Sequence, residues 1–326
     1  MKRVSVIVPH NVVMATIDGP RQLFSAVNDF LAASGQPALF DVQFVGLSRE
    51  VSQQDGRYTV HTDRLLKDVK KTDLIIIPAL TGDITTALEA NIGMNPWIVD
   101  QYNNGAEVVS LCIGAFFLAN TGLLDGKKCS THWMFGKELE TRFPEVEVVE
   151  GSIITEDRGI YSSGGANSYW NLLLYLVEKY TDRRLAILAS KYFAIEIDRN
   201  TQSPFTIFKG QKGHEDAQIK NVQEYIEANY QEKMSVPDLA AMFALSRRSF
   251  ERRFKKATAN TVVEYIQRVK IEAAKITLES ERANVNEVVY SVGYTDPKAF
   301  RSTFKKITGL SPLQYRSKYS RGFLED

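Results

Sequence analysis

The hydrophobic positions of the first 200 residues form short apolar runs separated by segments with helical spacing. The runs rich in Val, Ile and Leu predict buried strands at Val4–Pro9, Phe40–Leu47, Leu74–Pro78 and Val108–Cys112. They lack the two-residue alternation of a half-exposed strand, which is typical of a parallel sheet covered on both faces. Helical spacing predicts helices at Pro20–Ser34, Asp83–Asn103, Gly114–Asn120, Gly165–Tyr180 and Asp182–Phe193. The alternation of strands and helices therefore predicts a layered α/β fold with a mostly parallel sheet.

The pattern changes near residue 200. Residues 201–217 contain a proline, two glycines and scattered charges, and this composition predicts a linker. From residue 218 to residue 318 the periodic segments are helical, and none is typical of a strand. We therefore predict an α/β domain over residues 1–200, a linker over 201–217 and an all-α domain over 218–326.

The helical domain contains an internal repeat with a period of 50 residues. Two phenylalanines four residues apart, followed by Lys-Lys, occur in both copies. The matching pairs are Phe250 and Phe300, Phe254 and Phe304, Tyr265 and Tyr315, and Leu239 and Val289. This self-similarity predicts two copies of one helical unit.

Each copy has the pattern of a helix-turn-helix unit, over about 236–256 and about 285–307. A short first helix and a turn precede a second helix, which begins near Ser246 or near Asp296 with Pro297 in its first turn. One face of the second helix carries the phenylalanines, and the opposite face is mostly basic. Such a helix fits the DNA major groove, where side chains reach base edges and Lys and Arg neutralise phosphates. A solvated surface helix is the alternative, and the tandem arrangement favours DNA.

The candidate DNA-contacting residues are Arg247, Arg248, Glu251, Arg252, Lys255, Pro297, Lys298, Arg301, Ser302 and Lys305. The charge distribution agrees with this prediction. The whole chain has a net charge of +1, but residues 218–326 carry 19 Lys and Arg against 13 Asp and Glu, a net charge of +6. An acidic body with a basic second domain indicates double-stranded DNA as a partner, and a solvated charged surface is again the alternative.

The composition argues against several other classes of protein. At 44% hydrophobic and 24% charged residues, the chain is typical of soluble globular proteins. No apolar run reaches the roughly 18 residues of a membrane span, and the N-terminal run is too short for a signal peptide. Two cysteines and four histidines are dispersed without ligand spacing. We therefore expect no metal, no cofactor, no membrane partner and a cytoplasmic location.

The helical domain resembles the DNA-binding domains of AraC/XylS-type transcription regulators over about residues 220–318. The resemblance is carried by Gly-Tyr-Thr-Asp at 293–296, by Phe300 and Phe304, and by Gly-Leu-Ser-Pro-Leu-Gln-Tyr-Arg at 309–316. The chain departs from the family at 259–262, where Ala-Asn-Thr-Val replaces the usual Gly-x-Ser-Pro, and at Ser302, where many members have Arg. The family implies two DNA-reading helices that contact adjacent major-groove segments of a promoter and are joined by a long helix, here about Val262–Leu278.

The α/β domain contains a candidate nucleophile, Cys112. An apolar strand runs directly into it, Gly114 follows at the start of a helix, and His132 lies twenty residues later. This pattern predicts a nucleophile elbow, in which the following amides and the helix dipole favour a thiolate. His132 is the candidate base, with a structural hydrogen-bonding role as its alternative. We assign no chemistry to Cys129.

Over about residues 3–195 the chain resembles the PfpI-like branch of the class I glutamine amidotransferase-like superfamily, which implies a flavodoxin-like fold. The resemblance is carried by Asp-Gly-Pro at 18–20, by the Cys112 elbow, and by Gly-Leu-Leu-Asp-Gly at 122–126 leading to Thr-His-Trp at 131–133. Such a domain fused to an AraC-type domain resembles the GlxA family of regulators. That resemblance implies an effector such as an amino acid or a quaternary amine, and a homodimer formed through the α/β domains.

The chain departs from the enzymes of this superfamily around the cysteine. Gln22 stands where Glu is common, Thr16 stands where isonitrile hydratase relatives have a catalytic Asp, and Ile113 stands where proteases have His. The loop at 78–82 lacks the Gly-Gly pair that helps to form an oxyanion hole. Without a positioned acid or base and without oxyanion donors, acyl transfer loses much of its transition-state stabilisation.

We therefore expect a DNA-binding transcription regulator, not an enzyme, with RNA polymerase as a further partner and a ligand pocket over Cys112. A cysteine-dependent amidase or hydratase and a thiol redox sensor are the alternatives, with Cys112, His132 and Asp18 as vestigial catalytic candidates. Gly165 follows a second glycine and opens a helix, which is either an anion-binding geometry or a tight turn. The candidate ligand-binding residues are Asp18, Gly19, Ala79, Leu80, Cys112, Ile113, His132 and Gly165.

Overall fold

The computed structural model describes residues 1–197, 201–208, 210–280 and 284–320. The chain forms two compact units, Met1–Gln202 and Ser203–Asp326. Residues 198–200 of the predicted first domain, residue 209 of the predicted linker, and residues 281–283 and 321–326 of the predicted helical domain lie outside the described residues. The predicted fold class, a mostly parallel sheet with helices followed by an all-helical region, is confirmed.

The first unit is built on a seven-stranded sheet within the described residues, with strand order β10-β11-β7-β6-β1-β2-β5. All neighbouring strands pair in parallel except β10, which is antiparallel to β11. Two short sheets, β3–β4 and β8–β9, are separate from it. The strands are β1 Lys2–Ile7, β2 Phe40–Gly46, β3 Glu50–Gln53, β4 Tyr58–His61, β5 Arg64–Leu65, β6 Leu74–Ile77, β7 Glu107–Ser110, β8 Lys128–Cys129, β9 Glu147–Val148, β10 Ile154–Asp157 and β11 Ile160–Ser163.

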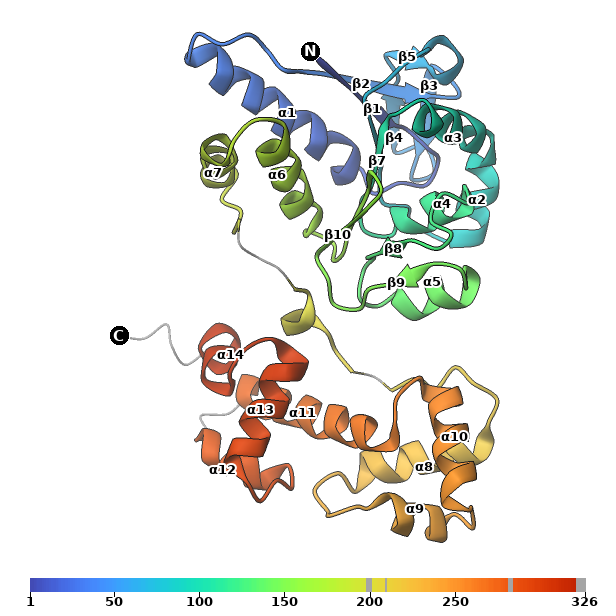
Figure 1. The fold of residues 1–326 in the computed structure, drawn as a ribbon, viewed down its shortest axis with the longest axis vertical. Coiled ribbons are helices and arrows are strands. Elements are labelled where there is room, and N and C mark those ends of the chain that lie inside the picture. Colours follow the sequence, from blue (N-terminus) through green and yellow to red (C-terminus); the bar gives the residue numbers. More distant parts are fainter. Residues whose placement is uncertain (198–200, 209, 281–283, 321–326) are drawn as a thin grey trace. The chain divides into compact units, whose positions relative to one another are not determined.

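Helices cover both faces of this sheet (Figure 1), with α1, α6 and α7 on one face and α2 to α5 on the other. The helical segments are α1 Ala15–Ala33, η1 Leu66–Asp68, α2 Ile84–Asn91, η2 Ile92–Met94, α3 Asn95–Asn103, α4 Gly114–Asn120, α5 Gly136–Arg142, α6 Tyr169–Tyr180 and α7 Arg183–Tyr192. Successive residues of a strand point to opposite faces, so Leu74 and Ile76 enter one core while Ile75 and Ile77 enter the other. This two-sided burial explains why the strands read as continuous apolar runs.

Three predicted helices differ from the structure, and one of them, predicted to open at Gly165, begins four residues later at Tyr169, because Gly165 lies in a turn. The first helix of the chain begins at Ala15, five residues before its predicted start, so that Pro20 lies inside α1. The helix predicted over Asp83–Asn103 is divided into α2, the 3₁₀ turn η2 and α3. A new helix starts there because Pro96, near the N-terminus of α3, fits the first turn, where a helix needs no proline N–H. The hairpin β3–β4 and the strands β5, β8, β9, β10 and β11 were not predicted.

The second unit contains helices and no strand among its described residues. Its segments are η3 Ser203–Phe205, α8 Ala217–Ala228, α9 Val236–Met242, α10 Arg247–Thr258, α11 Val262–Ser280, α12 Val285–Ser291, α13 Pro297–Thr308 and α14 Pro312–Tyr319. One core surrounds Phe250 and Phe254, and another surrounds Phe300 and Phe304. The long helix α11 contributes its first half to one core and its second half to the other, and so joins the two helix-turn-helix units.

The segment predicted as a linker packs on the helical unit. Phe208 belongs to the core around Phe254, with its ring centroid 5.1 Å from that of Tyr265. The Nζ of Lys275 donates to the carbonyl oxygen of Thr206 at 2.6 Å, and the Nε2 of Gln223 donates to the carbonyl oxygen of Gln211 at 3.0 Å. The proline, glycines and charges of residues 201–217 predicted a linker. Its apolar residue Phe208, however, packs against the core of the helical unit.

Candidate functional site

The carboxyl ends of β6, β7 and β11 lie side by side, because these strands are parallel neighbours. The loops that follow them carry Ala79, Cys112 and Gly164-Gly165. Ligands of open α/β sheets bind outside this edge of the sheet. We call it the carboxyl edge.

The backbone at Cys112 has the predicted elbow geometry. Its φ angle is 54°, in the left-handed region that a non-glycine residue adopts at a cost of about 1–3 kcal/mol. The following helix α4 starts against the end of β6. A Cβ atom at Gly114 would lie 2.6 Å from the carbonyl oxygen of Pro78 and 2.9 Å from that of Ile77, so only glycine fits there.

The thiol of Cys112 is protonated, contrary to the thiolate that the elbow pattern predicts. Cys112 is only 6% exposed, and burial raises the pKa of its thiol to about 11. The backbone N–H of Ile113 acts in the opposite direction on this pKa but does not offset the burial. Desolvation penalises the charged form more than one amide and a helix of only seven residues stabilise it.

His132 makes structural contacts. Its Nδ1 accepts a hydrogen bond from the backbone N–H of Met134 at 3.2 Å, and its ring stacks on Trp133 at a centroid distance of 5.5 Å. Burial lowers the pKa of the imidazole, which favours the neutral ring. Among the contacts described for His132, none joins it to Cys112, so the structure does not pair the predicted base with the predicted nucleophile.

The amide that could contribute to an oxyanion hole is already bonded. The N–H of Ala79 donates to the Oγ1 of Thr16 at 3.0 Å, and Thr16 in turn donates to the carbonyl oxygen of Val13 at 2.6 Å. Leu80 forms an antiparallel bridge with Val12. Thr16 stands at the position of a catalytic acid in related enzymes. Here its hydroxyl links the loop after β6 to the start of α1 by hydrogen bonds.

Asp18 is bonded to side chains of its own helix, and no described contact joins it to the elbow. Its carboxylate accepts hydrogen bonds from Arg21 and Gln22 on the same helix, with the Arg21 Nη2 at 2.8 Å. The guanidinium of Arg21 also lies over the ring of Phe44, 5.7 Å from its centroid. The neighbouring predicted residue, Gly19, packs against the Tyr169 ring, where a Cβ would lie 2.9 Å from the hydroxyl oxygen.

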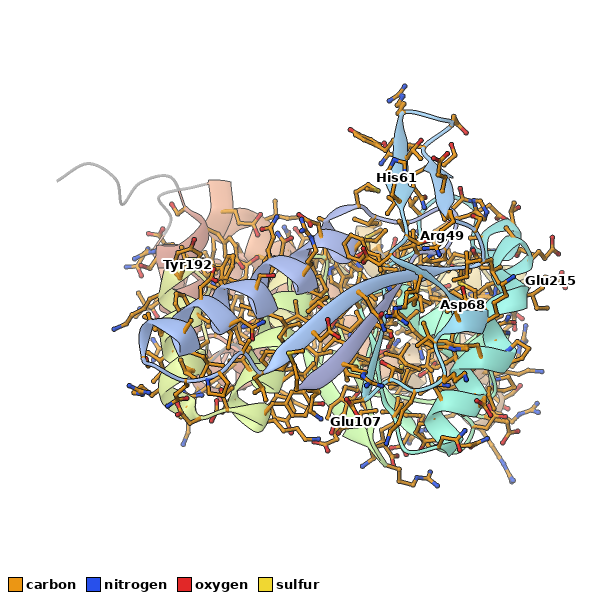
Figure 2. All side chains as sticks on the ribbon, turned by 90° about the horizontal axis from the view of Figure 1, so that it is seen from above. Arg49, His61, Asp68, Glu107, Tyr192 and Glu215 are labelled. Atoms are coloured by element: carbon orange, nitrogen blue, oxygen red, sulfur yellow. The ribbon has the colours of Figure 1, made fainter. Side chains whose placement is uncertain are left out.

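Asp18 instead lines an open cleft of about 520 Å³. The hairpin β3–β4 forms one wall of the cleft and projects from the body of the unit, as the labelled His61 shows (Figure 2). The cleft is lined by Met14, Ala15, Ile17, Asp18, Phe44, Thr59, Val60 and His61. Asp18 is the single member of the predicted ligand-binding set in this lining, so Asp18 and Cys112 do not share it.

The turn at Gly164-Gly165 packs around a side chain that sequence reasoning missed, Gln202. Gln202 is 1% exposed, and its amide contacts the backbone of Thr131, Trp133 and Ser152. The predicted residue Gly165 has a φ angle of 39°, and a Cβ there would lie 3.1 Å from the Oε1 of Gln202. No local motif marks Gln202, because its partners are backbone atoms from distant segments.

The predicted DNA-contacting side chains lie on the exposed faces of α10 and α13, with Pro297 partly buried. Ser246 caps α10 by accepting from the N–H of Ser249, and Asp296 caps α13 by accepting from the N–H of Lys298. Arg247 forms an ion pair with Glu251 at 3.2 Å. The Nη2 of Arg301 lies 3.4 Å from the Oδ1 of Asn286.

The two helices are anchored in nearly the same way. Phe254 packs edge-on against Tyr265 at 5.3 Å and 87°, and Phe304 packs against Tyr315 at 5.4 Å and 81°. These four rings are at most 2% exposed. Arg253, between the basic residues of α10, has a different role, because its guanidinium bonds both carboxylate oxygens of Asp216 at 2.7 and 2.9 Å.

Two kinds of feature are absent from the described ranges. No three His, Cys, Asp or Glu side chains gather where they could hold a metal ion. No helix in this part of the chain combines the length and the apolar character needed to cross a membrane.

Comparison with known proteins supports the assignment of both domains. The DJ-1/PfpI family model matches residues 2–179, and a helix-turn-helix domain model matches residues 239–318. The transcriptional regulator GbdR of Pseudomonas aeruginosa is 26% identical over 217 residues, which cover 66% of this chain and 59% of GbdR. The match to GbdR therefore spans less than two thirds of that relative. ArgR of the same organism is 25% identical over 67% of each chain, and GlxA of Rhizobium meliloti is 20% identical over 65% of each.

Solved structures support the fold. A putative transcriptional regulator from Vibrio parahaemolyticus superposes with a TM-score of 0.52 and 23% identity, covering 59% of this chain and 98% of that one. An AraC family transcriptional regulator from Pseudomonas putida gives a TM-score of 0.50 with 23% identity, covering 59% of this chain and all of that one. With its family match over more than half of its length, the chain belongs to the DJ-1/PfpI family and joins that domain to an AraC-type helix-turn-helix domain, as in the GlxA-like regulators.

Proposed function

We propose that this chain is a sequence-specific DNA-binding transcription regulator whose first unit binds a small, nitrogen-containing effector. The observation that carries the proposal is the pair of matching helices α10 and α13. Each is fixed by buried aromatic rings on one side and exposes basic side chains on the other. The names of the relatives, which are HTH-type transcriptional regulators, support the same function.

The N-terminal residues of each helix would contact base edges, and the lysines near its end would contact phosphates. Arg248 and Lys298 occupy equivalent positions in the two copies, as do Lys255 and Lys305. Glu251 and Arg301 are also equivalent but have opposite charge, so the two helices would prefer different bases. A homodimer would present four such helices and require two half-sites, and RNA polymerase would be a further partner.

Binding rather than turnover is the better interpretation of the first unit. The Cys112 thiol is buried with a pKa of about 11, and the Ala79 amide is occupied by Thr16. Acyl transfer would need a thiolate and free oxyanion donors. The carboxyl edge, near Ala79, Cys112 and His132, is the proposed effector site.

The test is a binding selection from random duplexes with the full-length protein, followed by variants. Arg248→Ala or Arg301→Ala should each weaken binding to the selected duplex by about 1–3 kcal/mol, because each removes a side chain that bonds a base edge. Arg253→Ala is the matched control, since its guanidinium bonds Asp216 within the fold. Unchanged affinity in both of the first two variants would show that the DNA-contacting faces are elsewhere.

The effector is sought by thermal shift with amines, amino acids and their amides, and mass spectrometry then checks each compound for conversion. Stabilisation with the compound unchanged supports a sensor. Consumption of a compound, abolished by Cys112→Ser, would restore the enzyme alternative.

A further inference from the structure

Gln202, the last residue of the first unit, turns its side chain back into that unit. Its Nε2 donates to the carbonyl oxygens of Thr131 at 3.0 Å and Ser152 at 2.8 Å. Its Oε1 accepts from the backbone N–H of Trp133 at 3.2 Å. Among the described contacts, the backbone around this amide therefore offers two acceptors and one donor. We call these three backbone groups, with the turn Gly164-Gly165, the amide cradle.

The amide cradle is complementary to one functional group, a primary carboxamide. Such a group has two N–H donors on one atom and an acceptor on the other, which is the pattern the cradle presents. A carboxylate would place an oxygen against two carbonyl oxygens, and an ammonium group would face the N–H of Trp133. Buried polar groups left unpaired or opposed weaken binding, so the cradle favours a primary carboxamide over both alternatives.

The space for this amide depends on glycine. A Cβ atom at Gly164 would lie 1.8 Å from the Gln202 Nε2 and 2.6 Å from the carbonyl oxygen of Ser152. Beside the turn, the Oγ of Ser168 is fully buried and has no hydrogen-bond partner among the described residues. The Oγ of Ser168 and the Oε1 of Gln202 both lie about 3 Å from the point where a Cβ atom at residue 165 would be. This buried hydroxyl is a hydrogen-bonding group beside the cradle that no described protein atom satisfies, so a polar ligand group can bond to it.

The cradle is directly connected to the Cys112 elbow. Thr131, whose carbonyl accepts from Gln202, donates its own hydroxyl to the carbonyl oxygen of Cys112 at 3.0 Å. The N–H of Cys112 donates to the Oγ of Ser163, which immediately precedes Gly164, at 3.1 Å. The amide of Gln202 is therefore joined to the elbow by two successive hydrogen bonds through Thr131, and the Gly164 turn beside it follows directly on Ser163, which bonds the elbow.

We propose that the amide cradle is a recognition site for a primary carboxamide, occupied by Gln202 in this structure, and that the effector carries such a group and competes with Gln202 for it. This inference rests on the proposed effector-binding function and names the chemical class of the ligand. It also predicts how effector binding would act on the helical unit. The residue after Gln202 begins η3, which packs on α13 within the helical unit, so displacement of Gln202 releases the segment that packs on a DNA-reading helix.

Chemical rescue tests the proposal in the full-length protein. Gln202→Ala leaves the cradle without its amide, and propionamide is the probe. Saturating propionamide should raise the Tm of Gln202→Ala by roughly 2–4 °C and that of the wild type by clearly less. Propionate and N,N-dimethylpropionamide, which lack the two N–H donors, should give no rise. An equal response of variant and wild type to propionamide, or an equal response to the three probes, would overturn the proposal.

Gln101→Ala is the matched control, because Gln101 is also a buried glutamine of the first unit, with its Oε1 bonded to the N–H of Thr72 at 3.0 Å. A propionamide response of Gln101→Ala as large as that of Gln202→Ala would reduce the effect to cavity filling and overturn the proposal. If Gln202→Ala does not fold, Gln202→Asn replaces it with a shorter amide, and propionamide should again stabilise it more than the wild type. The same preparations are assayed on the selected duplex. Intact DNA binding without amide rescue overturns this inference alone, whereas absence of specific DNA binding by the wild type overturns the proposed function.

Discussion

At the scale of single residues, Cys112 has the backbone of a nucleophile and the environment of a core residue. The left-handed φ angle follows from the close approach of Gly114 to the end of β6. The side chain, however, is desolvated, and no basic group compensates among its described contacts. Because the native thiol keeps its proton above its ordinary pKa of 9.0, the native state binds more protons than the unfolded state between pH 9 and about 11. The free energy of unfolding should therefore fall as the pH rises through this window, as measured by urea unfolding at a series of pH values.

The same burial predicts slow alkylation of Cys112. A thiol with a pKa of about 11 has about 100-fold less thiolate at neutral pH than one with a pKa of 9.0. Iodoacetamide should modify Cys112 of the native protein at least about 100-fold more slowly than in urea, as measured by mass spectrometry of the Cys112 peptide. Cys129, fully buried with a pKa of about 12, is the internal control and should be no faster. A native rate within tenfold of the unfolded rate would return redox sensing to consideration.

The elbow could be predicted from sequence because its determinants are local. A strand, a cysteine and a glycine within seven residues specify the turn. The direction of Asp18 could not be predicted, because it depends on Arg21, Gln22 and the distant ring of Phe44. Gln202 could not be identified for a similar reason, since its partners are backbone atoms of segments 50 to 71 residues away.

At the scale of elements, the internal repeat holds in detail. Thr258 and Thr308 both donate to the carbonyl oxygen of the last phenylalanine of their helix, at 2.8 Å in each copy. Both helices also end in a left-handed residue, Ala259 with φ 54° and Gly309 with φ 76°. The period of 50 was visible in sequence because both copies need the same apolar anchors. The strand β11 was not, because serines form half of it and its burial comes from the sheet around it.

The unequal caps give a stability prediction. Alanine in the left-handed region costs about 1–2 kcal/mol, and glycine removes this cost but adds some freedom to the unfolded chain. Ala259→Gly should therefore stabilise the helical unit by roughly 0.5–1 kcal/mol, measured by urea unfolding of the full-length protein. Gly309→Ala is the mirror control and should destabilise by about 1 kcal/mol. Destabilisation by Ala259→Gly would mean that the methyl group makes a contact worth more than the strain.

At the scale of the whole molecule, the two units have opposite charge. Residues 218–326 carry a net charge of +6 and the remainder −5, so a total of +1 conceals a basic domain. DNA, a polyanion, is attracted to surfaces where positive charges are concentrated, whatever the net charge of the whole chain. Binding to DNA should therefore depend on lysines of α10 and α13 and be insensitive to lysines of the first unit.

Salt dependence measures this directly. Removal of one lysine that neutralises a phosphate should lower the slope of log K against log salt by about 1 and weaken binding similarly for all duplex sequences. Lys255→Ala and Lys305→Ala, both exposed near the ends of their helices, should each reduce the slope by about 1, and the double variant by about 2. Lys191→Ala removes the same charge from the exposed surface of α7 and should leave the slope unchanged. An equal reduction in all three single variants would mean that the overall charge, and not the placement of the two helices, governs the encounter with DNA.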